Sequence, residues 1–270
     1  MTDSKKNIVQ YHNDLNELTF FRFNQVDFDF FMALCAKLKD SGIGKVTISF
    51  DEFRTLANYS SKTSMERFIT ELESMNYKQL LSSGTIRRGS KIKQFVLFTE
   101  FEIDQDEKTI TTKVNADYKY ILNEVTKNFT RFELEEFVRL SSKYSKVLYR
   151  LLKRFRMTGI YVVDVEEFRR LMMIPKSYTN MKIGQKILKP SVKMLEPYFK
   201  DLTYKVIYEK KPGRPVKGYK FTFTPEILPK KIEQAAEQKK DHNNSFHNFE
   251  QRQYDFGKLE TMLQGKNRKE

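Results

Sequence analysis

The segment from Gly84 to Lys91, GTIRRGSK, combines glycines and cations, the residue types that hold phosphate groups. A P-loop has the pattern G-x-x-x-x-G-K-[ST], and here its last two positions are exchanged. A P-loop also joins a strand to a helix, whereas this segment lies between two strand-like stretches, YKQLL and IKQFVLFTEF. Because a hairpin turn uses glycine for positive φ angles, the segment predicts a basic β-hairpin beside a phosphate backbone.

Nicking of DNA is the second chemistry to consider. Rolling-circle initiators cut DNA with a tyrosine beside a metal that two histidines, one residue apart, hold. The histidines of this chain do not have that spacing; they are His12, His242 and His247. One cysteine, Cys35, cannot supply a zinc site of the Cys/His type. We therefore expect no catalytic activity, no metal and no cofactor.

The positive charge of the chain is concentrated in its middle part. The net charge is +14, and residues 126–229 contain 23 Lys and Arg against 10 Asp and Glu. Residues 1–125 are almost neutral, with 17 against 18. A positive field confined to one domain attracts a polyanion such as DNA, RNA or anionic lipid. A cytoplasmic location is expected, because the chain has no apolar leader, no run long enough to span a membrane and no second cysteine for a disulfide.

Two segments 115 residues apart resemble each other. TISFDEFRTLANYSSKTS (47–64) aligns with VVDVEEFRRLMMIPKSYT (162–179), and both contain Glu-Phe-Arg-x-Leu. Each copy follows an amphipathic helix and a short β-prone stretch, and precedes a second amphipathic helix and two strand-like runs joined by a basic turn. The repeated order indicates a duplicated unit. Between the copies, residues 117–159 are expected to be helical, and Pro190 either begins a helix or kinks one that starts near Gly184.

Helix, short strand, two helices and a basic hairpin describe a winged helix, whose last helix enters the major groove of DNA while the hairpin is the wing. We therefore predict an α+β protein with two winged-helix domains in tandem and a weakly structured tail. The predicted ranges are 1–125 for the first domain, 126–229 for the second and main DNA-binding domain, and 230–270 for the polar tail.

The sequence resembles the initiator proteins of theta-replicating plasmids, which are built as tandem winged helices that bind repeats called iterons. The resemblance depends on SSKYSKVLYRLLKRF, EFRRLMMIPKSYTNMKIGQKILKPSVKMLEPY and YKVIYEKKPGRPVKGYKFTF, and it is strongest over residues 130–228. It implies that the second domain binds origin repeats in double-stranded DNA, while the first adds DNA contacts and forms a homodimer that represses. It also implies that monomers open the origin and help to load the host replicative helicase, together with the host initiator.

The candidate DNA contacts of the second domain lie on three elements. On the polar side of the recognition helix they are Lys182, Gln185, Lys186, Lys189 and Lys193. In the wing they are Lys210, Lys211, Arg214 and Lys217. At the start of the domain's first helix they are Lys143, Tyr144, Lys146 and Arg150, with Ser142. Gln185 is the predicted base-reading residue, because glutamine pairs with adenine, and the lysines are predicted phosphate contacts. Arg214 is predicted to enter an adjacent minor groove.

The matching contacts predicted in the first domain are Lys62, Thr63, Arg67, Arg87 and Arg88. Acidic residues share that helix, so weaker or non-specific binding is expected there. Three other functions stay open at this point. A transcription regulator would bind a single inverted repeat, a relaxase would form a tyrosyl-DNA adduct with metal present, and a membrane-surface protein would need an exposed apolar helix face.

Overall fold

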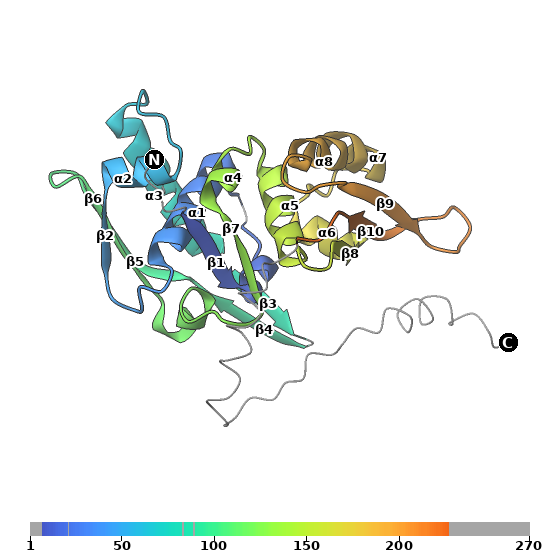
Figure 1. Ribbon diagram of the computed structural model, residues 1–270, viewed down its shortest axis with the longest axis horizontal. Coiled ribbons are helices and arrows are strands. Elements are labelled where there is room, and N and C mark those ends of the chain that lie inside the picture. The colour runs from blue at the N-terminus through green and yellow to red at the C-terminus, as the bar shows by residue number, and fades with distance from the viewer. Residues whose placement is uncertain (1–6, 21, 83, 89, 227–270) are drawn as a thin grey trace. The chain divides into compact units, whose positions relative to one another are not determined.

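The computed structural model describes residues 7–20, 22–82, 84–88 and 90–226. The chain divides into two units, Met1–Glu226 and Ile227–Glu270, and the first contains every described residue. The tail predicted for residues 230–270 therefore lies outside the described residues. Figure 1 shows the helices and strands in chain order.

Three helices and a three-stranded antiparallel sheet form the first winged helix. Its elements are α1 (Gln25–Leu38), β2 (Val46–Ser49), α2 (Phe50–Leu56), α3 (Met65–Ser82), β5 (Phe98–Asp104) and β6 (Thr109–Val114). The strand order is β2-β6-β5. α1 begins with a capping box, in which Asn24 and Asp27 each accept a hydrogen bond from the other's backbone N–H. The central strand β6 buries Ile110 and Val114 against the helices.

The second winged helix has the same architecture. Its elements are α5 (Lys143–Arg154), β8 (Ile160–Asp164), α6 (Val165–Leu171), α7 (Asn180–Ile183), η3 (Gly184–Leu188), α8 (Lys189–Leu195), β9 (Thr203–Tyr208) and β10 (Val216–Thr222). The strand order β8-β10-β9 repeats that of the first sheet. The predicted fold class, two winged helices in tandem, is confirmed.

The two copies also match in atomic detail at positions 115 residues apart. Nη2 of Arg54 donates to the carbonyl oxygen of Thr63 at 2.8 Å, and Nη2 of Arg169 donates to that of Tyr178 at 2.7 Å. In each copy a residue with positive φ ends the short helix, Asn58 at 50° and its counterpart Met173 at 52°. Such a φ is unusual for methionine, so its recurrence reflects the shared backbone path. The two segments thus have equivalent structures.

The basic segment of the first domain is a hairpin, as predicted, but it is not the wing. β3 (Gly84–Arg88) pairs with β4 (Lys91–Phe95) in a separate two-stranded sheet. The residues YKQLL before it belong to helix α3, not to a strand. The first wing is the β5–β6 hairpin, because those strands hold the places of β9 and β10 in the equivalent sheet. The β3–β4 hairpin is therefore an insertion that the second copy does not share.

The remaining elements join the two copies. They are β1 (Ile8–His12), η1 (Asn13–Glu17), η2 (Ala116–Ile121), β7 (Phe129–Glu133) and α4 (Leu134–Val138). β1 pairs antiparallel with β7, so the expectation that residues 117–159 are helical is wrong over residues 129–133. The pairing connects residues 129–133 with the start of the chain, and the predicted boundary after residue 125 stays a prediction.

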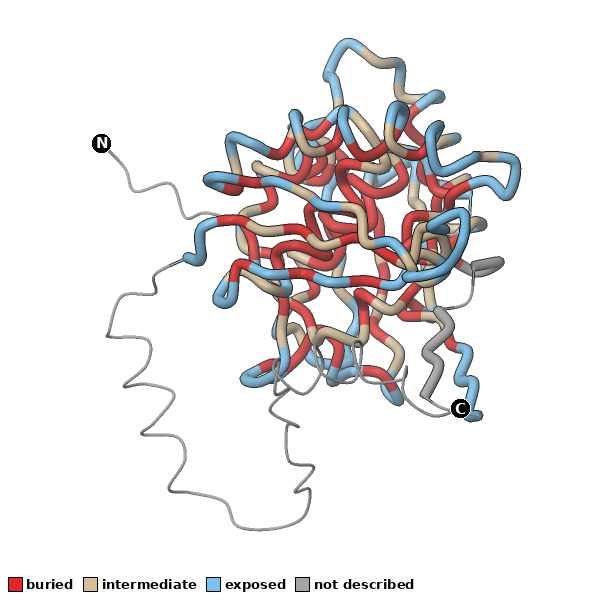
Figure 2. Tube along the Cα trace, turned by 90° about the vertical axis from the view of Figure 1, so that its right-hand side faces the viewer, coloured by how far each residue is buried: buried red, intermediate tan, exposed pale blue. Residues whose placement is uncertain are grey.

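Aromatic side chains fill the core of both copies. Phe20, Phe23, Phe28 and Phe31 pack in tilted and edge-to-face pairs with ring centroids 4.8–6.0 Å apart. In the second domain Phe168 lies 4.7 Å from Tyr219, ring centre to ring centre. Figure 2 shows the buried residues running through the interior of the molecule. Cys35 is buried among them, as expected for a small apolar side chain.

Candidate nucleic-acid interface

The recognition helix of the second domain is one continuous helical run over residues 180–195. Thr179 begins it by accepting a hydrogen bond from the N–H of Lys182 at 3.3 Å. The middle, Gly184–Leu188, has π-helical geometry, and α8 follows with Pro190 in its first turn. A proline there lacks only an N–H that a helix start leaves unpaired anyway. Pro190 therefore lies in the first turn of α8, as one of the two expectations had it, although α8 continues directly from the helical turns before it.

The five candidate contacts of this helix all lie on its exposed side. Its other side is buried in the domain core through Ile183, Ile187, Leu188 and Leu195. The exposed candidates are Lys182, Gln185, Lys186, Lys189 and Lys193. Within the described part of the chain, no hydrogen bond or ion pair engages the side chains of the last four. Their charges and amide groups are therefore available to a ligand, and their role in DNA contact stays a prediction.

The second wing carries its cations at the tip of the β9–β10 hairpin. Lys210, Lys211 and Arg214 are exposed, and Lys217 is half-buried. Gly213 and Arg214 have positive φ angles of 77° and 42°, which turn the chain back. The guanidinium of Arg214 lies over the Tyr208 ring at 5.3 Å, an arrangement that holds it at the tip. Lys211 pairs with Glu209 at 2.8 Å, which raises the pKa of the lysine.

Two of the predicted phosphate contacts on α5 are wrong, because the side chains of Lys146 and Arg150 are fully buried. Nζ of Lys146 lies 2.5 Å from Oδ1 of Asp29 on α1. The guanidinium of Arg150 donates to the carbonyl oxygens of Leu15 and Leu18, both at 2.9 Å. These cations therefore fasten α5 to the first domain.

Burial also changes the acidity of these groups. It raises the pKa of Asp29 to about 7 and lowers that of Lys146, because the charged form of each is poorly solvated. It lowers the pKa of Arg150 as well. Lys143 and Tyr144, at the start of the same helix, are half-buried, with Nζ of Lys143 at 5.2 Å from the Tyr144 ring centre. Their predicted role in DNA contact stays a prediction.

The candidates of the first domain lie in a less positive setting. Lys62 and Arg67 are exposed and Thr63 is half-buried. Nε of Arg67 is paired with Oε1 of Glu71 at 3.1 Å, one turn along α3. Arg87 and Arg88 lie on β3, where their backbones pair with Ile92 and Lys91. The weaker binding expected of this helix stays a prediction.

The true first wing is acidic, which the sequence prediction missed. The β5–β6 hairpin contains five acidic residues and two lysines, against one acidic residue and six cations in the β9–β10 hairpin. At its tip Asp106 and Glu107 are exposed. The equivalent strand order of the two sheets identifies this wing, and that order is visible only in the structure.

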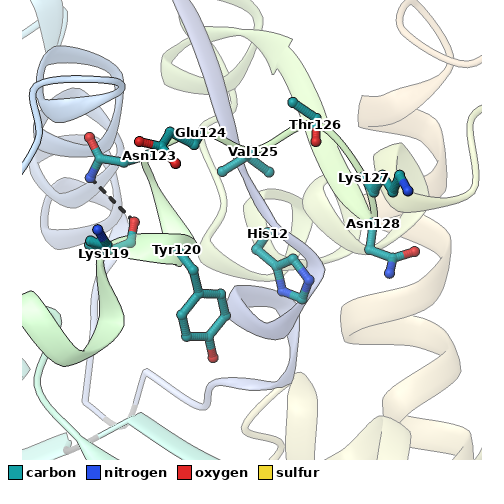
Figure 3. Close-up of a pocket in the computed structure, with 9 residues that line it drawn as sticks. All are labelled: His12, Lys119, Tyr120, Asn123, Glu124, Val125, Thr126, Lys127 and Asn128. Carbon is teal, nitrogen blue, oxygen red and sulfur yellow. Dashed lines mark hydrogen bonds between the residues drawn. The ribbon is translucent and has the colours of Figure 1, made fainter. Parts of the chain in front are cut away.

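None of the predicted contacts lines a surface hollow of about 350 Å³. It is lined by His12, Lys119, Tyr120, Asn123, Glu124, Val125, Thr126, Lys127 and Asn128 (Figure 3). Oδ1 of Asn123 accepts from the N–H of Gly42 at 2.7 Å, and the Tyr120 hydroxyl donates to Asp14 at 3.0 Å. These polar groups are occupied by the protein itself.

Two other kinds of site are absent from the described residues. No three His, Cys, Asp or Glu side chains there are grouped so that they could hold a metal ion. No helix in the same part of the chain is long and apolar enough to span a membrane. His242 and His247 lie outside the described residues.

Tandem winged helices, with an exposed cationic helix and wing on the second copy, define a class of DNA-binding proteins. The chain matches two family models, Initiator Replication protein, WH1, over residues 8–153 and Initiator Rep protein, WH2, over residues 164–223. A probable replication protein rep of Bifidobacterium longum is 34% identical over 224 residues, which cover 82% of this chain and 74% of that protein. The chain belongs to this family of replication initiator proteins, and the predicted family is confirmed.

The fold also has a counterpart among solved structures. The crystal structure of the Pi initiator protein in complex with iteron DNA matches with a TM-score of 0.62 at 18% identity. The match covers 82% of this chain and 98% of that one. At this identity the likeness establishes the shared fold.

Proposed function

We propose that this initiator binds direct repeats in the double-stranded DNA of a plasmid origin, mainly through its second domain. The helix over 180–195 lies in the major groove, and the β9–β10 wing follows the phosphate backbone to the next minor groove. The observation that carries the proposal is the exposed polar side of this helix, with four lysines and Gln185. Support comes from the family and from the fold shared with a protein solved on iteron DNA.

The proposal includes a division of labour between the domains. The first domain, with its acidic wing, forms a homodimer that represses, and monomers open the origin and recruit the host initiator and replicative helicase in the cytoplasm. An acidic wing is repelled by phosphates, so a protein partner suits it better than DNA. No step in this scheme requires catalysis by the chain itself, a metal or a cofactor.

The test of DNA binding uses a duplex that carries one direct repeat from the DNA flanking the gene, with a random duplex of equal length as reference. Lys186→Ala and Arg214→Ala should each weaken binding to the repeat and lower the slope of log affinity against log salt by about one. Lys45→Ala is the matched control, because Lys45 is an exposed lysine of the first domain that pairs with Glu100. Unchanged slopes in both variants would contradict the proposed placement of helix and wing.

The finer steps need a second measurement. Permanganate should modify unpaired thymines in a supercoiled origin plasmid only when the protein is present. Repeat binding without such opening would leave a transcription regulator as the better description. A covalent tyrosyl-DNA adduct formed with metal present would contradict the non-catalytic role.

A further inference from the structure

The first turn of the recognition helix exposes an unexpected side chain. Met181 is 73% exposed, the highest value among the large apolar side chains in the described residues. Single exposed apolar residues are common and by themselves need no explanation. This one, however, lies at the second position of a helix whose other exposed residues are lysines, amide-bearing residues and Pro190. The first turns of recognition helices are the parts that reach base edges.

Gly184 lies one turn further along the helix, on the same face as Met181. Residues three and four apart share a helix face, so Met181, Gly184 and Gln185 lie together. A Cβ added at Gly184 would meet no atom within 4 Å, so packing inside the protein does not require glycine there. Its φ of −56° is ordinary helical geometry, so the backbone does not require it either. Glycine inside a helix is unfavourable compared with alanine, and close approach of the backbone to a ligand is a reason to keep it.

The start of this helix is held in place by its neighbours. Nζ of Lys182 lies 4.2 Å from the centre of the Tyr178 ring, and Thr179 caps the helix. Arg169 in turn donates to the carbonyl oxygen of Tyr178 at 2.7 Å. The first turn of the helix is therefore fixed in position, and Met181 on this turn has an unbranched, adaptable side chain. Such a side chain is suited to following the edge of a base pair.

We infer that Met181 packs on the C5-methyl group of a thymine in the origin repeat, and that Gly184 lets the helix come close enough for this contact. The thymine methyl is the apolar feature that base edges present in the major groove. Gln185 is four residues along, about 6 Å at the helical rise, which corresponds to about two base pairs. The inferred thymine therefore lies within about two base pairs of the adenine predicted for Gln185. This inference depends on the proposed DNA binding of the second domain.

Replacement of thymine by deoxyuridine tests the contact, because uracil pairs identically and lacks only the methyl group. In the full chain, one or two deoxyuridine positions of the repeat duplex should weaken binding about fourfold, the effect of one buried methyl-sized group. Met181→Ala should weaken binding to the thymine duplex by a similar factor and should abolish the effect of deoxyuridine at that position. Met181→Leu should retain the effect, since it keeps an apolar side chain.

Two further variants separate this contact from other roles. Gly184→Ala should melt at the same or a higher temperature while it loses repeat affinity, a combination that a purely structural glycine would not give. Met157→Ala is the control, an exposed methionine outside the recognition helix, and should keep the full deoxyuridine effect.

The outcomes distinguish the inference from the function on which it depends. Deoxyuridine effects that persist in Met181→Ala, or that are absent in the wild type, would overturn the inference while repeat binding and the Lys186→Ala slope still supported the proposed function. Equal affinity of the wild type for repeat and random duplexes would instead overturn the proposed function.

Discussion

The two winged-helix domains have one architecture and two charge patterns. Their strand orders are equivalent, and Arg54 and Arg169 make the same hydrogen bond to the loop before the last helix. The second wing carries cations at its tip, whereas the first carries Asp106 and Glu107. The fold depends on the buried residues and on a few hydrogen bonds, whereas the kind of ligand that a domain binds depends on its exposed residues. A duplicated domain can therefore keep its structure and change its partner.

The comparison also shows where the copies are joined. α5 opens the second winged helix, yet Lys146 and Arg150 on this helix are bound by the first domain. The helix thus supports the recognition helix on one side and the first domain on the other. A movement of α5 would therefore change contacts in both copies.

The largest predicted effect concerns the joint between α5 and the first domain, where Lys146 pairs with Asp29. Asp29→Asn leaves the buried ammonium of Lys146 without its counter-charge, and we expect a loss of roughly 3–5 kcal/mol in the free energy of unfolding. Denaturant unfolding measures this loss. The control is Glu52→Gln, which breaks an exposed pair with Lys37 and should cost at most about 1 kcal/mol. Equal losses in the two variants would mean that the joint is no stronger than a surface contact.

Lys146→Met changes the pH dependence of the same joint. Without the lysine the folded-state pKa of Asp29 lies above its present value of about 7, because burial acts unopposed. A carboxyl whose pKa is raised on folding favours the folded state below its unfolded-state pKa near 4, and this advantage is lost as the pH rises through the folded-state pKa. Between pH about 4 and 7 the folded-state Asp29 is protonated in both proteins, so the variant should lose stability relative to the wild type as the pH rises above about 7, where only the wild-type carboxyl ionises. Unfolding curves at several pH values check the direction, and a constant difference would contradict it.

The equivalent hydrogen bonds of Arg54 and Arg169 allow a matched test of the two copies. Arg54→Ala and Arg169→Ala each remove a partly buried hydrogen bond to a backbone carbonyl, and each should cost about 1–3 kcal/mol of stability. Only Arg169→Ala should also weaken binding to the origin repeat, because Tyr178 lies directly before the recognition helix. Stability and binding are measured on the same preparations. Equal losses of DNA affinity would show that both copies read DNA and would remove the proposed division of labour.

The smallest effect is expected at the first wing. Asp106→Lys combined with Glu107→Lys reverses the charge of an exposed tip without touching the core. If DNA passes near this wing, affinity for random duplex at low salt should rise about two- to fivefold and return to the wild-type value at high salt. The neutral pair Asp106→Asn and Glu107→Gln serves as the control. A rise of a hundredfold would place the first wing directly on DNA and break the comparison.

Sequence periodicity predicted several features of the candidate interface well. The polar side of the recognition helix, with Gln185 and Lys186, was predicted from helical periodicity, and the structure exposes it while Leu188 and Leu195 are buried on the inner side. The repeat of Glu-Phe-Arg-x-Leu identified the duplication because the arginine serves the same hydrogen bond in both copies. These features depend on residues that are close to one another in the sequence.

Two errors have a common cause in long-range pairing. The stripe of Lys146 and Arg150 on α5 has the spacing of a solvated polar face, and only the approach of Asp29 and Leu15 from the first domain buries it. The basic hairpin looked like a wing because local sequence does not specify which strands join which sheet.

By itself, the sequence determined the class of fold, the duplication, the concentration of charge in the second copy and the exposed side of its last helix. These are consequences of local periodicity and composition. Only the tertiary structure decided that two cations join the domains, that the first wing is acidic and that β3–β4 is an insertion. Burial of a charge and the order of strands in a sheet depend on residues more than a hundred positions away or on competing partners, which no local pattern contains.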